Sequence, residues 1–151
     1  MSNIKIDEIN IKNWNDIQEL RTRVGLGGRL GEYQKQLFES NPLLANGIKY
    51  SKGWVIKDNN RIVGFIGSIP LLYRFQNNDI ISATANSFGV EPDYRNFTLQ
   101  LASTFLNQKN IDLLLNTTAD KSAEIVFSYL KSKKIPQKNY NKVLFYICNG
   151  R

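Results

Sequence analysis

The strongest constraint on the fold is a run of three consecutive strands joined by tight turns. Residues 53–58 and 61–75 are rich in apolar and β-branched side chains and are separated only by Asn59–Asn60. A second short turn leads into a third strand-like segment, 79–90. Turns this short join antiparallel neighbours, so the sequence predicts an antiparallel meander. Pro70 has no N–H to donate to a neighbouring strand, and we therefore expect it at an edge, bulge or bend.

The residues before this meander are expected to form one strand and two helices. Isoleucines alternate over 4–11, which indicates a strand with a bulge or turn near Asp7 and Glu8. A helix is expected next, with Asn15 as its N-cap and Gln18 as its capping-box partner. A second short helix is expected to carry on one face Tyr33, Leu37 and Phe38.

The pattern changes after the third strand, where helical and strand-like segments alternate. A loop is expected over 90–96 and a helix over 98–109. The short apolar run 111–117 is typical of a strand buried on both faces. Another helix is expected around 123–130, and a last strand over 142–148. A strand–helix–strand unit of this kind should be parallel and right-handed.

The fold class that follows is α/β, of the mixed α+β type. Antiparallel N-terminal strands and one parallel crossover should share a central mixed sheet with helices on both faces. No repeat or linker interrupts the pattern, so we expect residues 1–151 to form a single domain.

Composition excludes several kinds of site. The chain has no histidine and one cysteine, Cys148, which excludes a histidine-based triad, a CxxC motif and an intrachain disulfide. We expect no metal. The N-terminus carries no apolar segment typical of a signal peptide, and no apolar run is long enough to span a membrane. We therefore expect a cytoplasmic protein that does not bind a membrane. The net charge of +7 suggests an anionic ligand.

The junction between strand 79–90 and helix 98–109 is the place where an anion would bind. Ligands of open α/β sheets bind beyond the carboxyl ends of strands, and a helix start offers unpaired N–H groups. Arg95 adds a positive charge there. A polyphosphate is the implied ligand; the alternative is an ordinary loop with a solvated Arg95.

The segment Val90-Glu91-Pro92-Asp93-Tyr94-Arg95 resembles motif A of the GNAT superfamily of acyl-CoA N-acyltransferases. The resemblance implies a GNAT-like domain with acetyl-CoA, or another acyl-CoA, as co-substrate. In that family the strand end pairs with the pantetheine arm, here Phe88, Gly89 and Val90. The following loop holds the pyrophosphate, here Arg95, Asn96, Phe97, Thr98, Leu99 and Gln100. Thr98 and Gln100 stand where the family has glycines.

A second family element is matched in spacing. The resemblance places Asp120, Ala123 and Phe127 in the cofactor site, with Asp120 in place of an asparagine and Phe127 in place of a tyrosine. The family often uses that tyrosine as general acid toward the CoA thiolate. Phe127 has no hydroxyl, so Tyr129 or water would have to serve instead.

The resemblance also implies a bulge in the strand over 79–90 that frees an N–H to stabilise the oxyanion. Ser87, Phe88 and Gly89 bracket that place, and Gly89 suits a bulge. The family's usual base is a carboxylate on this strand, and the polar residues from Ser82 onward, which are Ser82, Thr84, Asn86 and Ser87, include none. Asn86 or Ser87 could relay the proton through an ordered water; the alternative is that they lie on an exposed strand face.

Three functions remain open at this point. The first is transfer of an acetyl group to an amine of a small molecule or peptide, by direct attack in a ternary complex. The second is a non-catalytic CoA-binding or regulatory GNAT-like domain. A basic nucleic-acid-binding module is disfavoured, because no recognition motif accompanies the charge. The acceptor is left open, as are a homodimer and the last strand of the family's fold, since only 142–148 follows the last helix.

Overall fold

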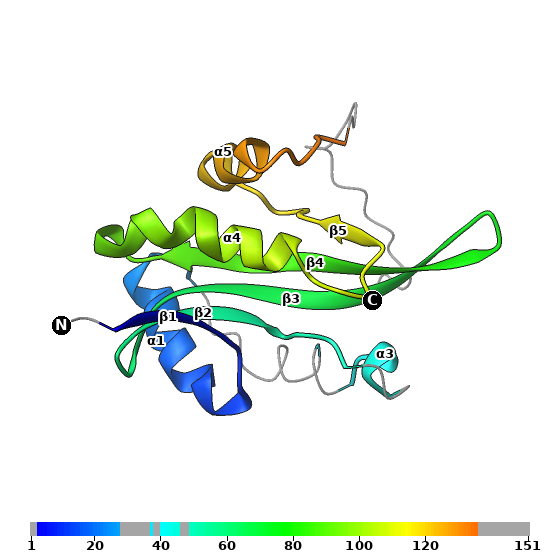
Figure 1. Ribbon diagram of the computed structural model, residues 1–151. Helices are drawn as coiled ribbons and strands as arrows, with labels where there is room; N and C mark the ends of the chain where they lie inside the picture. The colour runs from blue at the N-terminus through cyan, green and yellow to red at the C-terminus, as the bar shows by residue number, and fades with distance from the viewer. Residues whose placement is uncertain (1–2, 28–36, 38–39, 46–48, 136–151) are drawn as a thin grey trace, which may run out of the picture.

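In the part of the chain that the structure describes, five strands form one mixed sheet whose spatial order follows the chain (Figure 1). The computed structural model describes residues 3–27, 37, 40–45 and 49–135. The strands are β1 (Ile4–Glu8), β2 (Gly53–Asp58), β3 (Arg61–Phe75), β4 (Asn78–Val90) and β5 (Leu113–Leu115). The first three pairs are antiparallel, and β4 and β5 are parallel. The predicted meander and parallel crossover are therefore confirmed.

The meander has the predicted turns. Asn59 has a φ of 53°, and the second turn has φ values of 50° at Gln76 and 65° at Asn77. Asparagine tolerates this left-handed region better than most residues, which is why these short turns form here. Pro70 lies beyond Gly67, where pairing with β2 ends, and its carbonyl accepts a hydrogen bond from the Asn41 side chain. Pro70 thus faces an edge, as predicted.

Helices cover both faces of this sheet. They are η1 (Ile11–Asn13), α1 (Trp14–Arg23), α3 (Pro42–Ala45), η2 (Pro92–Phe97), α4 (Thr98–Leu106) and α5 (Lys121–Tyr129), where η marks a 3-10 helix. In Figure 1, α1 lies below the sheet, and α4 and α5 lie above it. None of the described helices is long and apolar enough to cross a membrane.

Two hydrophobic clusters fill the space between the helices and the sheet. Val55 packs with Ile17 and Leu20 of α1, whereas the next residue, Ile56, packs with Leu101 and Phe105 of α4. Successive strand side chains point to opposite faces, so β2 contributes to both clusters. All six of these side chains are fully buried.

The N-terminal elements differ from the prediction in two details. β1 pairs with β2 in an unbroken register as far as Glu8, so the bulge or turn expected at Asp7–Glu8 is wrong. Helix α1 begins at Trp14, so Asn15 lies inside the helix and is not its N-cap. The reason is that η1 runs directly into α1, which starts the helical geometry before Asn15.

The C-terminal half also differs in detail. β5 is not buried on both faces, since Leu113 is 41% exposed, because pairing with β4 is limited to three residues. Helix α4 ends at Leu106 instead of residue 109. Most of the second short helix, including Tyr33 and Phe38, and the strand over 142–148 lie outside the described residues.

Candidate functional site

A β-bulge interrupts strand β4 near its carboxyl end. Phe88 pairs with Ile66 and Asn86 pairs with Gly67, so Ser87 is the extra residue on β4. Ser87 has a φ of 57°, in the left-handed region that a serine seldom adopts. The expected bulge is therefore present, and Ser87 rather than Gly89 adopts its unusual conformation.

Among the described residues, no strand pairs with one edge of the last residues of β4. β5 pairs with β4 only at Ser82, Ala83 and Thr84. Further along β4, the Glu91 amide donates to the Val63 carbonyl at 2.9 Å, so Glu91 faces β3. Because backbone groups alternate along a strand, the amides of Val90 and Phe88 face the opposite, open side.

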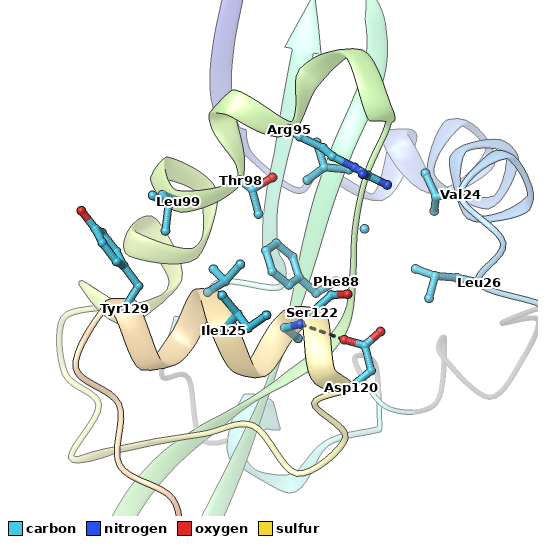
Figure 2. Close-up of a pocket in the computed structure, with 14 residues that line it drawn as sticks. Val24, Leu26, Phe88, Arg95, Thr98, Leu99, Asp120, Ser122, Ile125 and Tyr129 are labelled. Atoms are coloured by element: carbon cyan, nitrogen blue, oxygen red, sulfur yellow. Dashed lines mark hydrogen bonds between the residues drawn. The ribbon is translucent and has the colours of Figure 1, made fainter.

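A pocket of about 560 Å³ lies beside this open edge (Figure 2). Its walls come from the segment after α1, the end of β4, the start of α4, and α5. The lining residues are Val24, Leu26, Phe88, Gly89, Val90, Arg95, Thr98, Leu99, Asp120, Ser122, Ala123, Ile125, Val126 and Tyr129. Figure 2 shows α5 running along one side, with Val24 and Leu26 facing it across the pocket.

Most of the pocket wall is apolar, with a few polar groups at its ends. Arg95 comes from η2, Thr98 is the first residue of α4, and Asp120 is the residue that precedes α5. The Asp120 carboxylate accepts a hydrogen bond from the Ala123 amide at 2.8 Å and so caps α5. The Thr98 amide donates to the Arg95 carbonyl. The Arg95 guanidinium and the Thr98 hydroxyl are therefore polar groups that can bind a ligand there.

Hydrogen bonds and ion pairs fix the segment that leads from β4 into α4. The buried Glu91 carboxylate pairs with Arg23 at 2.7 Å and with Arg61 at 2.8 Å. The Tyr94 hydroxyl donates to the Asp58 carboxylate at 2.7 Å. That hydrogen bond raises the pKa of Tyr94 above its ordinary value, with burial and the nearby negative charge as smaller causes.

Eight of the twelve residues expected to bind the cofactor lie on the pocket wall. These are Phe88, Gly89, Val90, Arg95, Thr98, Leu99, Asp120 and Ala123. Asn96 and Gln100 are exposed and do not line the pocket. Asn96 belongs to η2 and Gln100 to the first turn of α4.

The remaining two expected cofactor residues belong to the hydrophobic core. Phe97 packs against the cluster beneath α4, and Phe127 is only 6% exposed. The Phe127 ring lies edge-on to Phe88 at 5.9 Å and to Phe105 at 6.2 Å, measured between ring centroids. Phe127 therefore supports the pocket from behind and does not line it.

The three expected catalytic residues do not converge on one point. Tyr129 lines the pocket and is 73% exposed. Asn86 and Ser87 are half-buried on β4, outside the set of lining residues. The Ser87 hydroxyl accepts a hydrogen bond from the Arg21 guanidinium at 2.5 Å.

Several pocket residues and one buried cation were not predicted from the sequence. The missed lining residues are Val24, Leu26, Ser122, Ile125 and Val126. Arg21 is the missed cation, and the sequence did carry a signal for it. Arg21 lies on the apolar stripe formed by Ile17, Leu20 and Val24, where a charged side chain must be buried.

Within the described part of the chain, no three histidine, cysteine, aspartate or glutamate side chains lie close enough together to hold a metal ion. No protein-family model matches the sequence, and no curated protein matches it either.

Solved structures with the same fold do match. A glucosamine-6-phosphate N-acetyltransferase from Arabidopsis thaliana aligns with a TM-score of 0.64 at 10% identity, covering 95% of this chain and 98% of that one. A predicted acetyltransferase with acetyl-CoA from Clostridium acetobutylicum aligns with a TM-score of 0.60 at 14% identity, covering 93% and 99%. A GCN5-related N-acetyltransferase from Kribbella flavida aligns with a TM-score of 0.63 at 13% identity, covering 85% of this chain and 32% of that one.

These alignments show that the chain has the GNAT fold, that of the GCN5-related N-acetyltransferases. The mixed sheet with its parallel β4–β5 pair and the helices on both faces are the features that match. In the Kribbella flavida protein, the aligned region is about a third of the whole chain.

Proposed function

We propose that this protein is an acyl-CoA-dependent N-acyltransferase that transfers acetyl from acetyl-CoA to an amine by direct attack in a ternary complex. The observation that carries the proposal is the bulge at Ser87, which adjoins the open edge of β4 beside the pocket. The acceptor is a small-molecule or peptide amine. Two of the structural neighbours are N-acetyltransferases by name and another holds acetyl-CoA, which supports this class of reaction.

The pocket suits the elongated arm of an acyl-CoA. Its volume lies in the ordinary range for small-molecule sites. The amides of Phe88 and Val90 face the open side of β4, so an extended pantetheine arm can hydrogen-bond there as an added strand would. Arg95 and the Thr98 hydroxyl lie at the end where the phosphates would bind. When bound, acetyl-CoA supplies an activated thioester.

The chain's own groups then have three tasks in the proposed reaction. The freed Phe88 amide donates a hydrogen bond to the carbonyl oxygen as negative charge develops on it. Asn86 or Ser87 passes the amine proton to an ordered water, because the part of β4 from Ser82 to Val90 carries no carboxylate and Asp79 lies in the distant β3–β4 hairpin, paired with Arg74. The Tyr129 hydroxyl or water protonates the thiolate that leaves.

The contrast between Tyr129 and Phe127 bears on the last step. Phe127 is buried in the core and has no hydroxyl, whereas Tyr129 lies on the pocket wall. Both residues belong to α5. Tyr129 therefore has the hydroxyl and the position on the pocket wall that a proton donor needs, and Phe127 has neither.

A non-catalytic CoA-binding domain is the second candidate. The observation that favours it is the lack of a carboxylate on β4 between Ser82 and Val90, together with phenylalanine at position 127. A domain of this kind would keep the pocket and the Arg95 contact but would not release CoA from acetyl-CoA.

Two measurements on the purified protein distinguish these candidates. Thermal unfolding with and without CoA tests binding, and thiol release from acetyl-CoA over a panel of amines tests turnover. Stabilisation by CoA together with amine-dependent thiol release supports the acyltransferase. Stabilisation without thiol release supports the non-catalytic domain, and no stabilisation contradicts both.

A matched pair of variants locates the binding site. Arg95→Gln should weaken CoA binding roughly tenfold, because a charge-assisted hydrogen bond to phosphate is lost. Arg74→Gln removes the same charge from the β3–β4 hairpin, where Arg74 pairs with Asp79, and should leave the affinity unchanged. Equal losses in the two variants would mean that CoA binds through net charge alone.

A further inference from the structure

Arg21 is a buried cation at the bulge of β4. Its side chain is only 6% exposed, although it lies on α1, far from Ser87 in the sequence. One terminal nitrogen donates to the Ser87 hydroxyl at 2.5 Å, and the other donates to the Gly27 carbonyl at 3.2 Å. Arg21 takes part in none of the ion pairs formed among the described residues.

Both partners in the Arg21–Ser87 hydrogen bond are unfavourable on their own. Burying a guanidinium without a carboxylate partner costs free energy, and burial lowers the pKa of Arg21. Its Nε also has no hydrogen-bond partner among the residues that the structure describes. Ser87 is a non-glycine residue in the left-handed region, which also costs free energy. Backbone strain and a buried charge that occur together are typical of functional sites.

The bulge determines where the next residue points. Phe88 follows Ser87, lines the pocket, and has its amide on the open side of β4. If Ser87 left the left-handed region, β4 could no longer hold this extra residue in the bulge. The Phe88 amide would then turn away from the open side of β4.

A second contact ties Arg21 to the opposite wall of the pocket. Its side chain holds the Gly27 carbonyl, and its own carbonyl accepts a hydrogen bond from the Leu26 amide at 2.9 Å. Leu26 lines the pocket. Arg21 therefore connects the segment after α1 with the bulge of β4.

We infer that Arg21 is a positioning residue that holds the Ser87 bulge in the conformation that turns the Phe88 amide toward the acyl carbonyl. This inference rests on the proposed function. Arg21 does not touch the substrate and acts through Ser87.

The test uses Arg21→Met, Arg21→Lys, Ser87→Gly and the double variant Arg21→Met/Ser87→Gly. The first measurement is the φ of residue 87 in crystal structures of the variants. The second is the ratio of the affinities for acetyl-CoA and CoA by calorimetry. This ratio reports the contact with the acyl group, whereas a general loss of structure would weaken both ligands equally.

Arg21→Met should release Ser87 from the left-handed region and reduce the preference for acetyl-CoA roughly fivefold, with CoA affinity changed less than about twofold. Arg21→Lys should reduce the preference for acetyl-CoA less than Arg21→Met does. The lysine keeps the positive charge, but one ammonium replaces the two-pronged guanidinium. Arg21→Lys also provides the same test if Arg21→Met does not fold. Glycine adopts a positive φ unaided, so the double variant should regain the bulge and the preference.

Asn59→Gly is the matched control. Asn59 is also left-handed but lies in the β2–β3 turn, so this change should not rescue Arg21→Met. The inference would be overturned if Ser87 kept its left-handed φ in Arg21→Met. It would also be overturned if the double variant lost as much of the preference for acetyl-CoA as Arg21→Met does. If the wild-type protein binds neither ligand, the proposed function fails, while the φ of residue 87 still decides whether Arg21 holds the bulge.

Discussion

Gly89 shows how one missing side chain opens the pocket. A Cβ built at Gly89 would lie 2.9 Å from both the Val24 and the Leu26 side chains. Both of these side chains line the pocket opposite α5. The Gly89 backbone is in an ordinary strand conformation, so glycine is required at this position for space and not for conformational freedom.

We therefore expect Gly89→Ala to weaken CoA binding roughly three- to tenfold, because Val24 and Leu26 must move into the pocket. Calorimetric titration with CoA provides the measurement. Gly27→Ala is the control, since a Cβ at Gly27 meets nothing within 4 Å. Unchanged affinity in Gly89→Ala would mean that CoA does not occupy this part of the pocket.

Residue identity alone did not decide which aromatic side chain of α5 faces the ligand. The spacing of the family element selected Phe127, yet Phe127 is held in the core by Phe88 and Phe105. The lining position belongs to Tyr129, two residues further along the helix. Such a distinction depends on how α5 is rotated against the sheet.

At the scale of the elements, Asp120, the N-cap of helix α5, has two opposing roles. Asp120 caps the helix through the Ala123 amide, which stabilises it, and also lines the pocket. Its negative charge is unfavourable for a phosphate ligand in the same pocket.

Two substitutions separate these roles. Asp120→Ala should remove the cap and lower the free energy of unfolding by about 1 kcal/mol, or roughly 2–4 °C in Tm. Asp120→Asn should keep Tm within about 1 °C, because asparagine caps equally well. It should also tighten CoA binding roughly twofold, since a negative charge is lost. Thermal unfolding and calorimetry provide the readouts, and equal Tm losses in both variants would exclude the capping role.

The 3-10 helix η2 is held to β2 by the hydrogen bond from Tyr94 to Asp58. The pKa of Tyr94 is raised in the folded protein, so this bond contributes stability fully below the ordinary tyrosine pKa of 10.0. The contribution is lost as the pH rises through the higher folded pKa.

Tyr94→Phe should therefore have a lower Tm than the wild-type protein at pH 7, and the difference should shrink as the pH rises above about 10. Denaturation curves from pH 7 to 11 measure this. Tyr73→Phe, on the exposed part of β3, is the control and should show no such convergence. A difference that stays constant with pH would contradict a role for the hydroxyl proton.

On the scale of the whole molecule, the net charge of +7 raises the question of which anionic ligand the protein binds. A nucleic acid would be attracted by the total charge, whereas CoA needs the pocket as well. The proposed CoA site assigns part of this charge to Arg95 on the pocket wall.

We expect CoA at one hundred times its dissociation constant to raise the free energy of unfolding by about 2.7 kcal/mol, which corresponds to roughly 5–10 °C in Tm. A 20-base-pair RNA duplex in low salt should produce no such shift. A larger shift with the duplex, lost as salt is added, would favour the nucleic-acid-binding alternative. The comparison is a thermal melt of the same protein with each ligand.

Much of the fold followed from local patterns. The strands at 53–58 and 61–75 were predicted to the residue, because a two-residue turn and alternating side chains act over short distances. The start of α1 was missed because η1 and α1 join without a break, which no single side chain signals. A strand was correctly predicted at β5, although over 111–117 instead of Leu113–Leu115. Its burial on both faces was wrongly predicted, since burial depends on the elements that pack around a strand. That residues 1–151 form a single domain stays a prediction.

The sequence by itself determined the order of strands and α-helices in the described residues, the parallel crossover and the position of the segment that carries Arg95. That segment is the 3-10 helix η2 and not the loop predicted over 90–96, because its i to i+3 hydrogen bonds leave no signature in the sequence. Only the tertiary structure decided that Ser87 takes the bulge, that Arg21 supports it and that Phe127 lies behind the pocket. Turns and side-chain periodicity are properties of neighbouring residues. The Arg21–Ser87 contact joins residues 66 positions apart, and the rotation of α5 depends on its packing against other elements.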